Sequence, residues 1–152
     1  MRCSGRFAIS IVLAASALPL WAGGIDSKPF DMDTIQALEA RASQAQPREQ
    51  CFLYAELVHQ MTEVSMKQYA AGDVEKATGM LKRVQEMAQK IHLQMGVDDK
   101  RLKNAEILLS HTAFRLNEML HSSSSEDRPL VEAALTDVNQ AQNEAMMQVF
   151  KK

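Results

Sequence analysis

Four long stretches of this chain each carry one apolar stripe at helical spacing, and this pattern constrains the fold most. Apolar residues recur every three or four positions over residues 47–71, 73–95, 99–121 and 127–149, the period of an α-helix that packs on one side. Pro47, Gly72, Gly96 and Pro129 stand at the borders, where helices begin or end. No segment alternates apolar and polar residues as a strand would, so we expect no sheet.

The predicted core consists of the residues on these stripes. They are Tyr54, Leu57, Val58, Met61, Val64 and Ser65; Ala77, Met80, Leu81, Val84, Met87, Ala88, Ile91 and Met95; Leu102, Ala105, Leu108, Leu109, Thr112, Leu116, Met119 and Leu120; and Val131, Ala134, Leu135, Val138, Ala141, Ala145 and Val149.

A shorter helix is predicted over residues 33–44, capped by Asp31 or Asp33 and ended before Pro47. Its apolar side carries Ile35, Leu38, Ala42 and Ala45. Because short connections force neighbouring helices to run antiparallel, the four long helices favour an up-down-up-down arrangement. The fold class we expect is all-α, a four-helix bundle with a short additional N-terminal helix.

The N-terminus has the pattern of an export signal. Arg2 and Arg6 precede an uncharged stretch over residues 7–20, and Ala22 offers a small residue for cleavage. We expect a signal peptide over residues 1–22, a flexible segment over 23–32 and a helical bundle domain over 33–152. The mature protein would then be periplasmic or extracellular. An uncleaved anchor is the alternative, although the apolar stretch is short for a membrane span.

Charge and cysteine content narrow the functional classes. The chain has 17 basic and 19 acidic residues, and removal of Arg2 and Arg6 leaves 15 basic residues and a net charge of −4. This balance argues against nucleic acid as a partner and against a membrane role beyond the export signal. Cys51 is the one thiol that remains after cleavage, so no intramolecular disulfide is expected. We predict that Cys51 is buried, with an intermolecular disulfide as the alternative.

One hairpin resembles part of a tetratricopeptide repeat. Gly72-Asp73, Ala77 and Met80-Leu81 match the turn of that repeat, in which one helix ends at glycine and the next brings a small residue to the crossing. The resemblance covers about 34 residues, implies a helical solenoid, and has no second copy at that period. The Trp, Leu-Gly and closing Pro of the pattern are missing, so the bundle remains our expectation.

Two E-x-x-H motifs raise a metal-binding alternative. A Glu and a His three residues apart share one side of a helix, and ferritin-like di-iron bundles use two such pairs with two further Glu. The motifs here are Glu56 with His59 and Glu118 with His121, and Glu75 or Glu86 with Glu132 or Glu144 would complete the set. Both motifs lie away from the apolar stripes, which argues for solvent-facing side chains. A haem inside the bundle is a further alternative, also without an inward-facing His.

A second, minor apolar strip runs along two of the predicted helices, on the side away from the core. If the helices follow sequence order around a ring, these two helices lie diagonally, so that the first helix covers one strip and leaves the other for a protein partner or a second copy. The strip residues are Ile107, His111 and Phe114 on one helix and Phe52, His59 and Met66 on the other.

No catalytic signature accompanies these strips. Cys51 has no recognisable His or Asn partner, and the sequence contains neither a glycine-rich phosphate loop nor a G-x-S-x-G motif. We therefore expect no enzyme activity and no cofactor. The function predicted from the sequence is a binding or structural role through protein contact, with a metal- or haem-binding bundle, such as a di-iron oxidoreductase, as the alternative.

Overall fold

The computed structural model describes residues 31–94 and 101–150, without the side chains of 92–94. The described residues form five α-helices and no strand: α1 (Met32–Gln44), α2 (Pro47–Ala70), α3 (Val74–Gln94), α4 (Leu102–Ser122) and α5 (Arg128–Phe150). The all-α prediction is confirmed, and each helix lies close to its expected range. The predicted signal peptide, most of the segment 23–32 and Met95 lie outside the described residues.

Local sequence signals explain where the first helices begin and end. The carboxylate of Asp31 accepts a hydrogen bond of 2.7 Å from the backbone N–H of Thr34, so Asp31 is the cap of α1. Pro47 is the first residue of α2, where its missing N–H costs nothing. Gly72 follows α2 with a φ of 84°, a left-handed conformation that glycine adopts without steric cost. The predicted stop at Gly72 is therefore confirmed.

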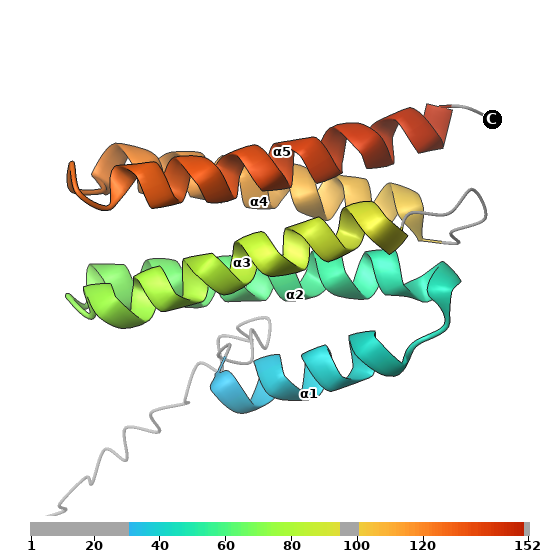
Figure 1. Cartoon of the computed structure of the whole chain (residues 1–152), viewed down its shortest axis with the longest axis horizontal. Helices are drawn as coiled ribbons and strands as arrows, with labels where there is room; N and C mark the ends of the chain where they lie inside the picture. The colour runs from blue at the N-terminus through green and yellow to red at the C-terminus, as the bar shows by residue number, and fades with distance from the viewer. Residues whose placement is uncertain (1–30, 95–100, 151–152) are drawn as a thin grey trace, which may run out of the picture.

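The helices stack in three layers (Figure 1). The first layer is α1, the second is the antiparallel pair α2 and α3, and the third is the antiparallel pair α4 and α5. Helix α2 contacts α1, α3 and α4, whereas α5 contacts α3 and α4. The two pairs therefore stack with α4 beside α2 and with α5 beside α3.

This order corrects one expectation from the sequence. A ring of the four long helices in sequence order would place α2 and α4, which carry the minor strips, on a diagonal. In the structure these two helices are direct neighbours. The diagonals are instead α2 with α5 and α3 with α4, and the described residues of these pairs have no Cα atoms within 8 Å. The helical periodicity fixes which side of a helix is buried, but it does not fix which neighbour buries it.

Burial follows the predicted stripes. Every stripe residue of α2 and α3 within the described ranges is buried, and the stripes of α4 and α5 are buried or half-buried. Leu57, Met61, Leu81, Leu109 and Leu116 are among the largest side chains with no more than trace exposure. Burying a side chain of this size contributes about 1.5–3 kcal/mol, so the stripes supply the main stabilisation of the fold. Cys51 is also fully buried, as predicted.

Helix α2 is buried on more sides than its single predicted stripe. Phe52, Leu53, Ala55 and Thr62 lie off that stripe and are buried as well. Gln60, a polar residue off the stripe, is only 9% exposed. The reason is that α1, α3 and α4 surround α2, so most of its circumference lies against another helix.

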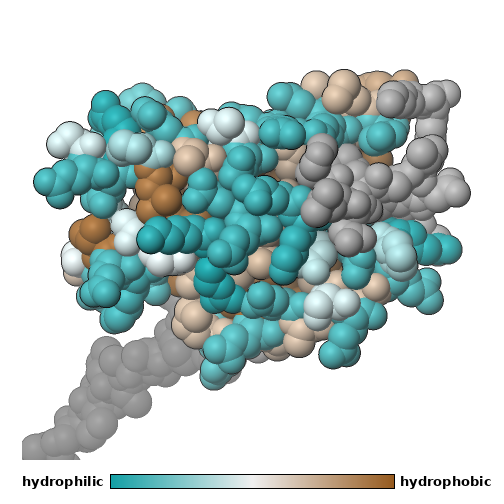
Figure 2. Space-filling model, in the orientation of Figure 1, coloured by the Kyte–Doolittle hydropathy of each residue, from teal (hydrophilic) through white to brown (hydrophobic). Residues whose placement is uncertain are grey.

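The surface over α3 and α5 is largely hydrophilic (Figure 2). Hydrophobic residues gather there at the end of the molecule where α3 and α5 begin. Within the described residues, no helix combines the length and the hydropathy that a membrane span requires.

Candidate protein-contact surface

A hydrogen-bonded pair of side chains joins α2 to α4. The Nδ1 atom of His59 lies 3.1 Å from the hydroxyl oxygen of Thr112, which is fully buried. The Thr112 hydroxyl itself donates to the carbonyl of Leu108 at 2.8 Å. Because that proton is already used, the hydroxyl oxygen accepts from His59, whose neutral ring therefore carries its proton on Nδ1. The pair fixes the register of the two helices at this level.

Burial lowers the pKa of His59, because the charged imidazolium is poorly solvated between the two helices. The carboxylate of Glu63 opposes this shift, whereas the nearby His111 and Arg115 add to it. His59 is therefore neutral at pH 7. The sequence placed His59 on the solvent side of α2, and this placement is wrong because α4 covers that side.

An ion-pair network continues the α2–α4 contact. Arg115 of α4 donates to both carboxylate oxygens of Glu63 on α2, through Nε at 2.6 Å and Nη2 at 3.2 Å, and it also donates to Glu118. The hydrogen bonds that Arg115 donates lower the pKa of Glu63, and the same bonds, accepted by Glu63 and Glu118, raise the pKa of Arg115. Glu63 and Arg115 both stay charged at neutral pH, so their ion pair links α2 to α4.

The four residues of the E-x-x-H motifs do not converge. Glu56 lines a groove between α1 and α2, and His59 contacts Thr112. Glu118 pairs with Arg115, and exposed His121 donates from Nδ1 to the carbonyl of Asn117 at 2.7 Å. Among the described side chains, no group of three or more His, Cys, Asp or Glu is placed to hold a metal ion. The geometry therefore gives no support to the di-iron arrangement.

The structure separates the two predicted contact strips. Phe52 is buried, and Met66 is half-buried against the core. With His59 they occupy the side of α2 that turns toward α4, so this strip is no free surface. On α4, Phe114 is 62% exposed, Ile107 is 46% exposed and His111 is exposed. Of the two strips, the α4 strip alone is open to a partner, and α1 has no Cα atom within 8 Å of α4.

A shallow groove borders the α4 strip. It has a volume of about 320 Å³ and lies along the junction of α2 and α4. Its lining residues are Phe52, Arg101, Asn104, Ile107, Leu108 and His111. The groove therefore continues the apolar surface of Ile107 inward, down to the ring of Phe52.

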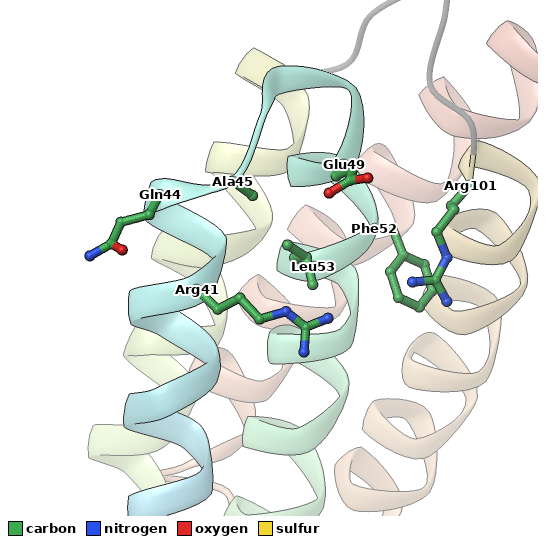
Figure 3. Close-up of a pocket in the computed structure, with 7 residues that line it drawn as sticks. All are labelled: Arg41, Gln44, Ala45, Glu49, Phe52, Leu53 and Arg101. Carbon is green, nitrogen blue, oxygen red and sulfur yellow. The ribbon is translucent and has the colours of Figure 1, made fainter.

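A second groove of similar volume lies on the other side of Phe52, between α1 and α2. Figure 3 shows Arg101 standing over the ring of Phe52, with Arg41 reaching from α1 toward this groove. Both Arg101 and Phe52 line the two grooves. The Arg101 guanidinium carbon lies 3.4 Å from the centre of the ring, which places the cation on the aromatic face. This contact holds Phe52 as a common wall of the two grooves.

Comparison with protein-family models, with curated proteins and with solved structures found no match to this chain. The surface along α4 offers apolar side chains, a shallow groove and exposed polar groups on a rigid helix. These are the components of a contact surface.

The apolar strips predicted from the sequence do not include every residue of this surface. Arg101 and Asn104 line the groove beside Ile107, although neither belongs to an apolar strip. The sequence spacing could have identified Asn104, because this residue precedes Ile107 by three positions and therefore lies on the same side of the helix. Arg101 could not be found in this way, because its contact with Phe52 depends on the adjacency of α2 and α4.

Proposed function

We propose that this chain is a small exported helical protein that acts by contact with another protein, and that the outward side of α4 makes the contact. The observation that carries the proposal is the pairing of exposed Phe114 with exposed Ile107 two turns away on one helix. Exposed aromatic and aliphatic side chains that adjoin a groove are typical of protein-binding surfaces.

The scaffold for this surface is, in our proposal, an up-down-up-down four-helix bundle formed by α2, α3, α4 and α5, with α1 as an additional helix against α2. The contacts of α2 with α3 and α4, and of α5 with the same two helices, support this arrangement. A bundle holds α4 on two sides and leaves a third side outward. The side chains at the contact would therefore be held on a rigid element.

We also propose export and cleavage after Ala22, on the strength of the basic, apolar and small-residue pattern of the first 22 residues. The intact mass of the protein recovered from the periplasm or the medium tests this proposal. The expected species begins at Gly23. Recovery of the whole chain from the cytosol alone would contradict it.

Site-specific photo-cross-linking tests the contact surface. A photoreactive phenylalanine analogue replaces Phe114 on α4, and a matched analogue replaces Thr136, an exposed residue on α5. Irradiation of living cells should yield a covalent protein adduct from position 114, and none from position 136. Circular dichroism of both variants should show the same helical content.

Two results would contradict the proposal. The first is the absence of any protein adduct at position 114 while the variant remains helical. The second is an equal adduct pattern at positions 114 and 136, because this would show non-specific collision rather than a defined surface.

A further inference from the structure

The outward side of α4 has a self-complementary arrangement of charge and apolar residues. Lys103 lies one turn before Ile107, and Glu118 lies one turn after Phe114. All four side chains are exposed. Along this side of α4 the order is therefore cation, aliphatic, aromatic, anion. The cation and the anion each lie four residues from the neighbouring apolar residue. Such a pattern matches its own reverse, since the positive end of one helix meets the negative end of an antiparallel copy.

We propose that two copies of this chain pair through α4, antiparallel, about a two-fold axis that passes between Ser110 and His111. This inference rests on the proposed function and names the partner as a second copy. With the axis at that position, Ile107 of one copy stands opposite Phe114 of the other. Lys103 of one copy then stands opposite Glu118 of the other, and the symmetry repeats both pairs.

The charges select the antiparallel arrangement over the parallel one. A parallel pair would bring Lys103 against Lys103 and Glu118 against Glu118, which is repulsive. Glu118 already receives Arg115 of its own helix, and an exposed carboxylate can accept a further cation. Among the described residues, no partner forms a hydrogen bond or an ion pair with the ammonium group of Lys103, so this group is available to the second copy.

The groove next to Ile107 gives the opposing Phe114 ring a place to lie. Its lining includes Phe52 and Leu108 as well as Ile107, so an inserted phenyl ring would contact apolar atoms on more than one side. The contact uses only one side of one helix from each copy. The surface area that it buries is therefore smaller than the roughly 1,200–2,000 Å² of a standard stable interface. The pair is therefore a weak, reversible dimer whose formation depends on concentration and ionic strength.

Charge reversal with rescue tests the pairing by sedimentation velocity at increasing concentration and low ionic strength. Lys103→Glu and Glu118→Lys should each weaken dimerisation by about tenfold, because each places two like-charged pairs across the axis. The double variant Lys103→Glu/Glu118→Lys should return to within about threefold of the original dissociation constant, since the pairs are restored with exchanged signs.

Rescue can arise only between copies. Residues 103 and 118 of one helix are separated by about 22 Å, given the rise of 1.5 Å per residue, so they cannot pair within a copy. A Met147→Ser variant serves as the control, because Met147 is an exposed apolar residue of α5, and its dimerisation should equal that of the unmodified chain.

Each other result overturns the pairing. A chain that stays monomeric at all concentrations excludes the dimer, and a dimer whose charge variants show no loss or no rescue excludes this register. If the chain is monomeric but the cross-linker at position 114 captures a different protein, the pairing fails and the proposed function stands. If position 114 captures nothing, the proposed function fails as well.

Discussion

Replacing Thr112 by valine should destabilise the protein through the loss of one hydrogen bond between α2 and α4. Valine keeps the shape and the β-branched character of threonine, so helix propensity and packing change little. The substitution removes the acceptor for His59 Nδ1 and the donor to the Leu108 carbonyl. Because His59 is half-buried, its N–H is only partly able to find water after the substitution.

The expected cost is about 1 to 1.5 kcal/mol, from a net hydrogen-bond contribution of about 0.5–1.5 kcal/mol plus incomplete solvation of the remaining donor. For a domain of this size, that corresponds to a fall in melting temperature of roughly 3–7 °C. Urea unfolding followed by circular dichroism measures the free energy of unfolding directly.

Thr136→Val is the matched control. Thr136 also donates to the carbonyl four residues earlier, at 2.8 Å, but it is exposed on α5 and no other side chain donates to it in the described contacts. Its replacement should change the unfolding free energy by less than about 0.5 kcal/mol. A double-mutant cycle of Thr112→Val with His59→Ala should give a coupling of about 1 kcal/mol. Equal effects of the two valine substitutions, or zero coupling, would refute the contact between α2 and α4.

Three further predictions concern pH, backbone conformation and the contact surface. Because burial lowers the pKa of folded His59 below its ordinary value near 6.5, the unfolded chain binds the proton first. The unfolding free energy should therefore fall as pH drops through 6.5 toward the folded pKa, and His59→Gln should flatten that part of the profile. Gly79→Ala on the open side of α3 should stabilise by about 0.5–1 kcal/mol, whereas Gly72→Ala should destabilise by about 1–2 kcal/mol because of its positive φ; chemical denaturation of the two variants should shift in opposite directions. Phe114→Ser should leave the melting temperature within about 2 °C while reducing the cross-linking yield from a reporter at Ile107, and a large loss of stability would show that Phe114 supports the fold instead.

The sequence predicts α3, α4 and α5 well because each of them packs against its two neighbouring helices mainly through one apolar stripe. Residues such as Leu81, Leu109 and Val138 recur at helical spacing and are buried where that spacing places them. The boundary at Gly72 is also predictable, because the left-handed conformation after a helix favours glycine over other residues. These features depend on local spacing and local backbone chemistry alone.

Helix α2 marks the limit of that reasoning. A single-stripe interpretation assumes one buried side, yet three helices surround α2 and bury Phe52 and Gln60 outside the stripe. The spacing of Phe52, His59 and Met66 predicts a second, minor strip on the outer side of this helix, whereas the structure turns that strip toward α4. Periodicity alone does not separate a strip that meets another helix of the same chain from a strip that meets a partner.

The candidate site was predicted only in part, because periodicity does not show which neighbour covers a strip. Ile107, His111 and Phe114 are exposed on α4 as expected, and whether they bind a partner stays a prediction. Phe52 supports the site from below as a wall of the groove, although it was expected on the outer surface. That role follows from the order of helices in space, which the lengths of the connections did not determine.

Hydroxyl-radical footprinting of purified protein tests most directly whether a second copy covers the outward side of α4. Oxidation of Phe114 and of Met147 is compared in dilute and in concentrated solution, since both side chains are largely exposed in the single chain. We expect the reactivity of Phe114 to fall on concentration while that of Met147 stays constant. Unchanged reactivity of Phe114 across the concentration range would contradict the account.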